Sequence, residues 1–378
     1  MGIKSSNRTS DGRGSWLMSL ALNTNYLTPT GKEEPWRFTP MNRLGGLHDD
    51  GVNVADSVSL ELVKNLPGVS FKKMAAKDLP AGYSSNDEIT KRIRKTVSEI
   101  AFLKVEKDTE LSESLILKRK TSGKPELSRT VIQIGQNARA TVIIENSGSA
   151  ILGEEIEINL EPGAALNFVT LQEWKNDSVH LGQHHAVLAR DSQFNSYTIS
   201  VGGSLVRLLP TVEYSGPGAS AELFGLYFAT NGQHLEHRIH VDHNVGNAKS
   251  RVNYKGALAG EKARTVWFGD VFIRKIAEGT DTYELNRNLL LTDGARADSV
   301  PNLEIETGQI VGAGHASTTG RFDDEQLFYL CSRGISPEVA RRLVIRGFFN
   351  EIVSKLANET IEERLMNRID SELSLVGN

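Results

Sequence analysis

The stretch GASAELFGLYFATNGQHLEHRIHVDHNVGNAKSRVNYKGALAG, residues 218–260, places short runs of β-branched, aromatic and leucine residues between turns that contain glycine or asparagine. The runs Glu222–Phe228, Arg238–Val241 and Val252–Tyr254 have the composition of β-strands. Similar runs recur over residues 97–321. Many short strands at close spacing predict a sandwich, a barrel or a solenoid.

The turns between these runs favour the solenoid. They contain glycines that recur in an imperfect rhythm, with one long step followed by three shorter ones, at Gly218, Gly246, Gly260, Gly279 and Gly294. This rhythm fits the coils of a β-solenoid, in which each coil buries its inner face only by stacking on the next. These turns do not exclude a β-sandwich, because Asn231-Gly232 and Asp293-Gly294 also suit tight hairpin turns.

The composition changes along the chain and predicts four regions. In order, they are a polar tail that is disordered or foreign to the natural protein (1–18), a helical and irregular segment (19–96), the β core (97–321) and a C-terminal helical domain (322–378). In the second region, the apolar spacing of Ser57–Leu66 predicts a helix. In the last, Ser336 and Pro337 predict a helix start. A helical tail of this kind either caps the open end of the β body or docks a partner.

The overall composition suits an ordinary soluble protein, with 378 residues, 39% hydrophobic and 24% charged, and a net charge of −4. This charge does not favour nucleic acid or an anionic membrane as a partner, and no apolar run is long enough to span a bilayer. Residues 1–18 lack the apolar block of a secretory signal, and Met18 is a candidate natural start. Cys331 is the single cysteine, so this chain alone cannot form a disulfide or a four-cysteine metal centre. We therefore expect a cytoplasmic protein.

Histidines are the most prominent candidate ligands. His234, His237, His240 and His243 are evenly spaced, but on a strand His234 and His240 face one way while His237 and His243 face the other. This alternation argues against a four-ligand metal site and leaves a two-histidine half-site open. A second cluster, at residues 180–185, has no acidic partner at a clear spacing.

His315 has a different setting, because small residues surround it at 312–317. An imidazole that projects there can ligate iron or zinc or act as a general base, although spacing alone favours a hydrogen-bonded surface histidine. Cys331 lies among core-type residues and is interpreted as a small buried hydrophobe. The chain has no Walker A pattern and no Gly-x-Ser-x-Gly elbow, which argues against ATP hydrolysis by this chain.

Longer motifs carry a resemblance to a known family. The segments PNLEI (301–305), GHASTTG (314–320) and DEQLFYLCSRGI (324–335) resemble the C-terminal block of the SufB/SufD family. The segments EPWRFTP (34–40), YKG (254–256) and NRNLLL (286–291) are similar to that family as well. The resemblance spans nearly the whole chain after residue 18.

The resemblance implies a right-handed parallel β-helix with helical N- and C-terminal segments. It implies a non-enzymatic subunit of the Suf iron–sulfur cluster assembly scaffold that pairs with a SufB-type relative through the β-helix and binds the SufC ATPase through the C-terminal helices. No cofactor is expected on the isolated chain, and iron or an iron–sulfur cluster is expected at the interface with a partner. An isolated chain is a candidate homodimer.

Within the family, the loop at His315 is most like the SufD branch, although Ala316 replaces the usual glycine and Ala313 stands where some members have a cysteine. The family makes His315 a candidate metal or cluster ligand at the subunit interface. It also implies a SufC-docking region that comprises Arg333, Gly334, Ile335, Ala340 and Phe348. The contact could equally run through residues 324–326.

Two other function classes compete with this interpretation. A β-helix polysaccharide lyase or hydrolase would need clustered carboxylates or basic residues on one strand face, and the sequence offers no clear cluster. A self-sufficient histidine-based metal protein would use residues 234–243. Cleavage of an acidic polysaccharide, or metal retained by the protein purified alone, would favour these alternatives.

Overall fold

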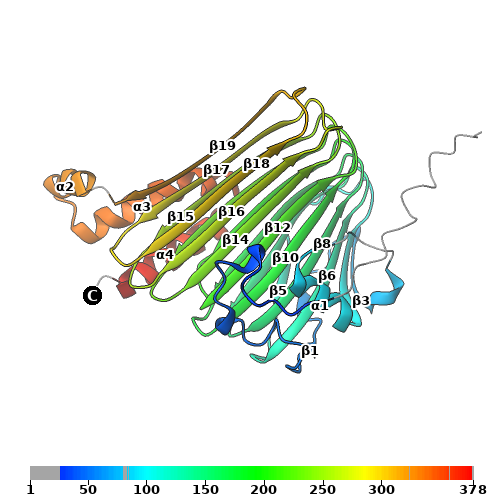
Figure 1. The fold of residues 1–378 in the computed structure, drawn as a ribbon, viewed down its shortest axis with the longest axis horizontal. Coiled ribbons are helices and arrows are strands. Elements are labelled where there is room, and N and C mark those ends of the chain that lie inside the picture. The colour runs from blue at the N-terminus through cyan, green and yellow to red at the C-terminus, as the bar shows by residue number, and fades with distance from the viewer. Residues whose placement is uncertain (1–25, 80–82, 84, 323, 357, 377–378) are drawn as a thin grey trace, which may run out of the picture.

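Two long parallel sheets face each other in the computed structural model and form a solenoid (Figure 1). The structure describes residues 26–79, 83, 85–322, 324–356 and 358–376, so the predicted tail at 1–18 lies outside the described residues. The parallel β-helix core and the helices towards both ends confirm the predicted fold class. The alternative of a sandwich is wrong, because successive strands along the chain alternate between the two sheets.

The first sheet contains ten strands and the second contains nine. The strands of the first sheet, called sheet A, are β18 (Arg296–Ile305), β16 (Arg264–Ile273), β14 (His234–His243), β12 (Leu205–Tyr214), β10 (Val179–Leu188), β8 (Ile151–Leu160), β6 (Pro125–Ile134), β4 (Glu99–Val105) and β3 (Val69–Ala75), with β1 (Ala55–Asp56) beside β6. Those of the second, called sheet B, are β19 (Gly312–Arg321), β17 (Asp281–Leu290), β15 (Lys249–Leu258), β13 (Ser220–Ala229), β11 (Gln193–Ser200), β9 (Ala165–Trp174), β7 (Arg139–Gly148), β5 (Leu115–Arg119) and β2 (Leu60–Leu62).

The strand register explains the glycine rhythm of the sequence. The start of β13 at Ser220 stacks on Lys249 of β15, so the long step from Gly218 to Gly246 is close to one full coil. Each of the shorter steps that follow spans a single strand, from one turn between the sheets to the next turn. Gly232 and Gly294 have positive φ values of 71° and 83° and lie in turns between the sheets. These turns are corners of coils and do not form hairpins.

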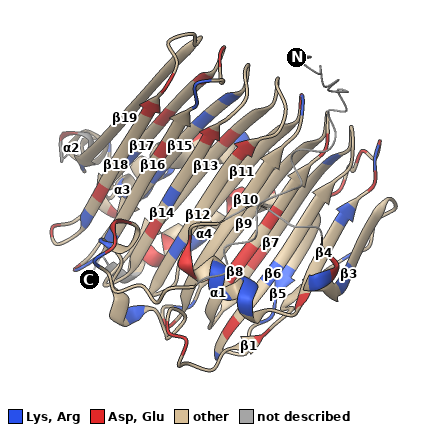
Figure 2. Cartoon of the chain, turned by 45° about the vertical axis from the view of Figure 1, so that its right-hand side comes forward, with Lys and Arg blue, Asp and Glu red and all other residues tan. Residues whose placement is uncertain are grey.

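Inward-facing apolar side chains of both sheets form the main core, which includes Leu152, Phe168, Leu208 and Tyr254. Additional layers cover the outer faces, so many strands are buried on both sides and read as continuous apolar runs in the sequence. Figure 2 shows the basic and acidic positions interspersed over the strands and loops. None of the helices that the structure describes has the length and apolar content that crossing a bilayer requires.

The N-terminal segment packs on the outer face of sheet A. It contains the short 3₁₀ helices η1 (Glu34–Trp36), η2 (Met41–Arg43) and η3 (Ala76–Asp78) and the helix α1 (Glu88–Thr96). The Asp87 side chain caps α1 by accepting a hydrogen bond from the Thr90 amide at 3.0 Å. Trp36 and Ile93 are buried against sheet A residues such as Leu181. This segment therefore hides one face of the solenoid.

The predicted helix over Ser57–Leu66 is wrong, because Leu60–Leu62 is strand β2. β2 pairs antiparallel with β5, and β3 pairs antiparallel with β4. Both strands cover the exposed edges of the first coil, whose backbone groups would otherwise lack partners. Edge pairing and burial of Leu60 in the main core thus outweigh the local helical spacing.

The C-terminal helices are α2 (Asp324–Ser332), α3 (Pro337–Val353) and α4 (Glu359–Val376), with the 3₁₀ helix η4 (Ser354–Leu356) between the last two. The predicted start of α3 is confirmed, since the Ser336 side chain accepts a hydrogen bond from the Val339 amide. Ile345 and Phe349 bury themselves with Tyr197 and Phe224 on the outer face of sheet B. The helices therefore cover a face of the solenoid and do not cap its end. Among the described residues, no strand pairs with the outer edges of β18 and β19.

Candidate functional site

His315 lies on β19, the last strand of sheet B, and stacks in register on Glu284 of β17. The His315 side chain is 43% exposed, whereas that of Glu284 is completely buried. Nδ1 of His315 is 3.6 Å from Oε1 of Glu284, which is too long for a good hydrogen bond. The predicted ligand is thus accessible at the end of the solenoid, and sequence reasoning missed the carboxylate beneath it.

Glu284 occupies an unusual position for a carboxylate. Neither of its oxygens has a hydrogen-bond partner among the described residues. A Cβ at Gly269 would lie 2.1 Å from Oε2 of Glu284, so the glycine leaves the space that the carboxylate fills. Burial raises the pKa of Glu284 to about 8, with the negative charge of Asp270 as a smaller cause. An ionised Glu284 is therefore unfavourable unless a cation approaches it.

Other polar side chains line the interior of the same last coils. The Tyr227 hydroxyl donates to Oδ1 of Asn288 at 2.7 Å and accepts from Nδ2 of Asn286 at 2.9 Å. Nδ2 of Asn288 donates to Oγ of Ser299 at 3.1 Å. This network links sheet B to β18 in sheet A across the interior. The segment NRNLLL, which carried part of the family resemblance, therefore fixes the coil that holds Glu284.

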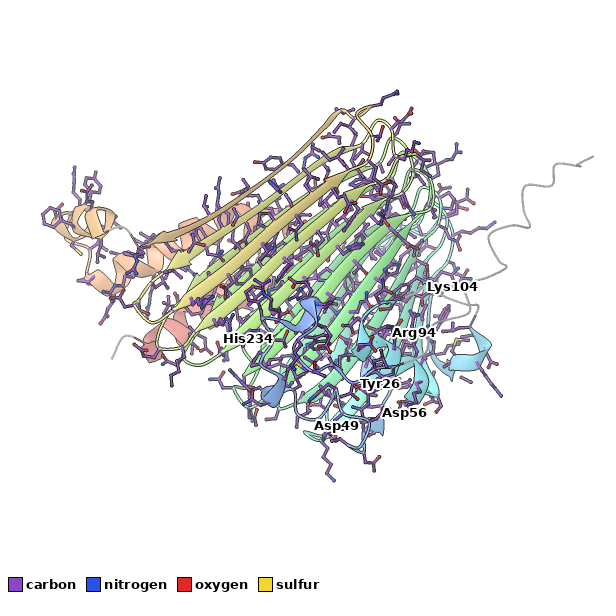
Figure 3. All side chains as sticks on the ribbon, in the orientation of Figure 1. Tyr26, Asp49, Asp56, Arg94, Lys104 and His234 are labelled. Atoms are coloured by element: carbon purple, nitrogen blue, oxygen red, sulfur yellow. The ribbon has the colours of Figure 1, made fainter. Side chains whose placement is uncertain are left out.

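The four histidines of β14 face opposite sides of sheet A, as predicted. Nε2 of His237 lies 3.0 Å from the Ser200 hydroxyl, and Nε2 of His243 lies 2.8 Å from the Ser250 hydroxyl, both in the interior. His234 faces the N-terminal segment and lies 3.0 Å from Oε2 of Glu236 (Figure 3). No group of three or more candidate metal ligands occurs in the described part of the chain. The alternation thus places His234, His237 and His243 in separate hydrogen-bonded environments on the two faces of the sheet.

The cluster at 180–185 has an acidic partner that its sequence spacing did not reveal. Nε2 of His180 and Nε2 of His184 both lie 3.1 Å from Oε1 of Glu154, and Arg119 forms an ion pair with the same carboxylate. All four side chains are buried in the solenoid interior. Glu154 stacks on Gly182, one coil later in the chain. Only knowledge of the local coil length would have revealed this pairing.

The residues predicted to dock the ATPase lie in the turn between α2 and α3 and on α3 itself. Arg333 and Gly334 are exposed, and Ile335 is partly exposed. Ala340 is completely buried and Phe348 packs partly into the cluster between α3 and sheet B, so a partner can reach them less readily. Of the alternative contact at 324–326, the side chains of Asp324 and Gln326 lie outside the described residues, and that of Glu325 is exposed.

Exposed apolar side chains adjoin this turn, and sequence reasoning did not single them out. Phe328 and Tyr329 of α2 are 75% and 58% exposed, and Leu343 of α3 is 46% exposed. The guanidinium of Arg333 lies 5.3 Å from the Tyr329 ring centre. Cys331 is only half-buried, whereas the sequence predicted a buried core cysteine. Large apolar groups that remain exposed on adjacent helices are typical of a protein-binding surface.

Comparisons with known proteins agree with these features. Residues 117–348 match the family described as the SUF system FeS cluster assembly, SufBD core domain. An iron–sulfur cluster assembly SufBD family protein of Mycobacterium tuberculosis (strain ATCC 25618 / H37Rv) is 45% identical over 360 residues, which cover 93% of this chain and 90% of that protein. A SufBD family protein of Mycobacterium leprae (strain TN) is 43% identical over 383 residues, which cover 99% of this chain and 97% of the relative.

A more distant relative is the iron–sulfur cluster assembly protein SufD of Escherichia coli (strain K12), which is 27% identical over 384 residues that cover 91% of this chain and 89% of that protein. The matched family region begins in β5 and ends in α3, so it includes the solenoid coils, His315 and the α2–α3 turn. The chain therefore belongs to the SufB/SufD family of iron–sulfur cluster assembly proteins.

Proposed function

We propose that this protein is a SufD-like, non-catalytic subunit of an iron–sulfur assembly scaffold in the cytoplasm. It pairs with a SufB-type subunit through the open end of the solenoid and docks a SufC-type ATPase through α2 and α3, without nucleic acid or membrane as a partner. The proposal rests on one observation at the end coil. There, β18 and β19 have free edges among the described residues, and the imidazole of His315 on β19 is accessible. The similarity to SufD of Escherichia coli supports the choice of branch.

The cargo of this scaffold is iron or an iron–sulfur cluster. A neutral imidazole of His315 can supply one nitrogen ligand to iron. Thiolate ligands must come from the partner, because the only cysteine of this chain is Cys331 on α2. The isolated chain consequently holds no cluster tightly, and a second copy of the chain is its partner when the SufB-type subunit is absent.

The proposed ATPase surface consists of Phe328, Tyr329 and Leu343 together with Arg333. The chain has no phosphate-binding loop, so nucleotide chemistry takes place in the partner. Exposed aromatic residues beside an arginine are typical anchors of a protein interface. The C-terminal helices also pack on sheet B through Ile345 and Phe349, so a force applied to them is transmitted to the solenoid.

The decisive experiment is co-expression of the chain with its SufB-type and SufC-type partners, followed by affinity purification and anaerobic cluster reconstitution. We expect a stable complex, and we expect His315→Ala to preserve the complex while lowering the cluster yield. Thr318→Ala is the matched control, because Thr318 is exposed on the same strand. Absence of both partners from the purified material would refute the scaffold function, whereas an unchanged cluster yield would make His315 structural.

The ATPase surface has a separate test. Phe328→Asp should weaken SufC-type binding at least about tenfold, because truncation or polar replacement of a central aromatic anchor commonly costs about 2 kcal/mol or more. Ile276→Asp is the control, since Ile276 is 71% exposed in the turn between β16 and β17. If both variants bind the SufC-type ATPase equally well, α2 does not form the contact.

A further inference from the structure

The buried carboxylate of Glu284 has no function in the fold that its contacts explain. It is completely buried, both of its oxygens lack a hydrogen-bond partner among the described residues, and Gly269 leaves room for it. Buried carboxylates in proteins are normally paired or bound to a metal. Nδ1 of His315, a ligand-type atom, lies 3.6 Å from Oε1 of Glu284.

We propose that Glu284 and His315 together form a half-site for a divalent first-row metal ion, with ferrous iron as the physiological occupant and the remaining ligands supplied by the partner subunit. This inference rests on the proposed scaffold function and adds to it a second ligand, from the preceding coil of the solenoid. The site is thus built by the stacking of β19 on β17.

The separation of the two ligand atoms fits this assignment. Nitrogen and oxygen ligands at 2.0–2.2 Å from a tetrahedral ion are about 3.4 Å apart, close to the 3.6 Å observed. A direct hydrogen bond would instead need a distance near 2.9 Å. One imidazole and one carboxylate form a donor set suited to iron, zinc or cobalt. The 43% exposure of His315 leaves the outer side of the site open to further ligands.

The position at the end of the stack explains why the half-site is incomplete. β19 pairs with β17 alone among the described strands. In the proposed assembly, the partner subunit supplies the next layer of side chains. The described residues contain no third candidate ligand at this point. A partner that stacks on the last coil would complete the coordination and enclose the ion in one step.

The test measures Co²⁺ binding by its visible absorption, for the full chain alone and for the full chain in complex with its SufB-type partner. The variants are Glu284→Gln, His315→Ala and the double variant. Glu304→Gln is the control, because Glu304 is an exposed carboxylate on neighbouring β18. We expect Glu284→Gln and His315→Ala each to weaken Co²⁺ binding at least about tenfold, and we expect the control to match the wild type.

Two further measurements separate the outcomes. Because glutamine removes an unpaired buried carboxylate, the metal-free Glu284→Gln chain should melt at or above the wild-type temperature. In metal-free buffer, pull-down of the partner by Glu284→Gln should be unchanged, and failure of the wild-type chain to bind the partner would count against the scaffold function. Wild-type Co²⁺ affinity in Glu284→Gln, or no Co²⁺ binding by either the chain or the complex, would overturn the half-site.

Discussion

Arg207 of β12 is the central contact between the N-terminal segment and sheet A, and its removal gives a quantitative prediction. Its side chain is 1% exposed. Its guanidinium donates to Oδ1 of Asp87 at 3.1 Å and to the Pro35 carbonyl at 3.2 Å, and lies 3.4 Å from Oε1 of Glu236. It also lies 4.0 Å from the ring centre of Trp36. One cation therefore holds two parts of the segment on the solenoid.

The substitution Arg207→Met keeps most of the side-chain volume but removes the charge. Burial alone would raise the pKa of Glu236, but the hydrogen bond from His234 and the charges of Arg207 and Arg238 hold it well below its usual range. Removal of one partner from a buried ion pair costs about 3–5 kcal/mol, and we expect the lower end because Arg238 still pairs with Glu236. This loss corresponds to an increase of roughly 100-fold in the equilibrium constant for opening of the N-terminal segment.

Native-state hydrogen exchange of the amides in α1 measures this opening. Arg274→Met is the matched control, since Arg274 pairs with Asp242 on the same sheet at 37% exposure and should cost less than about 1 kcal/mol. Addition of Glu236→Gln to Arg207→Met should cost less than the sum of the two single changes, because they share one interaction. An increase in α1 exchange of less than threefold in Arg207→Met would refute the reasoning.

Other predictions concern the solenoid interior. Burial lowers the pKa of His237 to about 3 and that of His243 to about 4, whereas an unfolded histidine titrates near 6.5. Below about pH 6.5 the unfolded chain binds protons at these histidines that the folded chain rejects, whereas the raised pKa of Glu284 acts in the opposite direction. In the Glu284→Gln background, which removes that opposing group, urea unfolding should therefore show stability falling from pH 7.5 to pH 5, and a flat profile would contradict this. A Cβ at Gly225 would lie 1.9 Å from the Tyr254 ring, so Gly225→Ala should destabilise the protein by about 1–3 kcal/mol or more in thermal unfolding, whereas Gly320→Ala, with open space around its Cβ, should cost less.

The sequence predicted well those features that depend on neighbouring residues. The strand runs, the corner glycines and the start of α3 at Ser336 all follow from local composition and turn chemistry. The opposite orientation of His237 and His234 follows from the two-residue period of a strand. Such features do not depend on how the coils stack.

The sequence did not predict features that depend on coil length. Glu284 meets His315, and Glu154 meets Gly182, only because each pair is separated by one full coil. The coil length varies along the stack, and a shift of one residue would place either carboxylate on the other face of its sheet. Strand β2 was missed for a related reason, since its conformation depends on the free edge of a distant strand, β5.

The location of the candidate site follows from the energetics of a solenoid. In the middle of the stack, a buried polar group can find partners in the coils on both sides, as Glu154 does with Arg119, His180 and His184. Glu284 lies one strand before the open end, with β15 and β19 on its two sides, and still has no hydrogen bond among the described residues. In the proposed complex, a cation and a partner that bind together would remove the energetic cost of this unpaired carboxylate. Subunit pairing and cargo binding would then stabilise each other, and each should strengthen the other by the same factor.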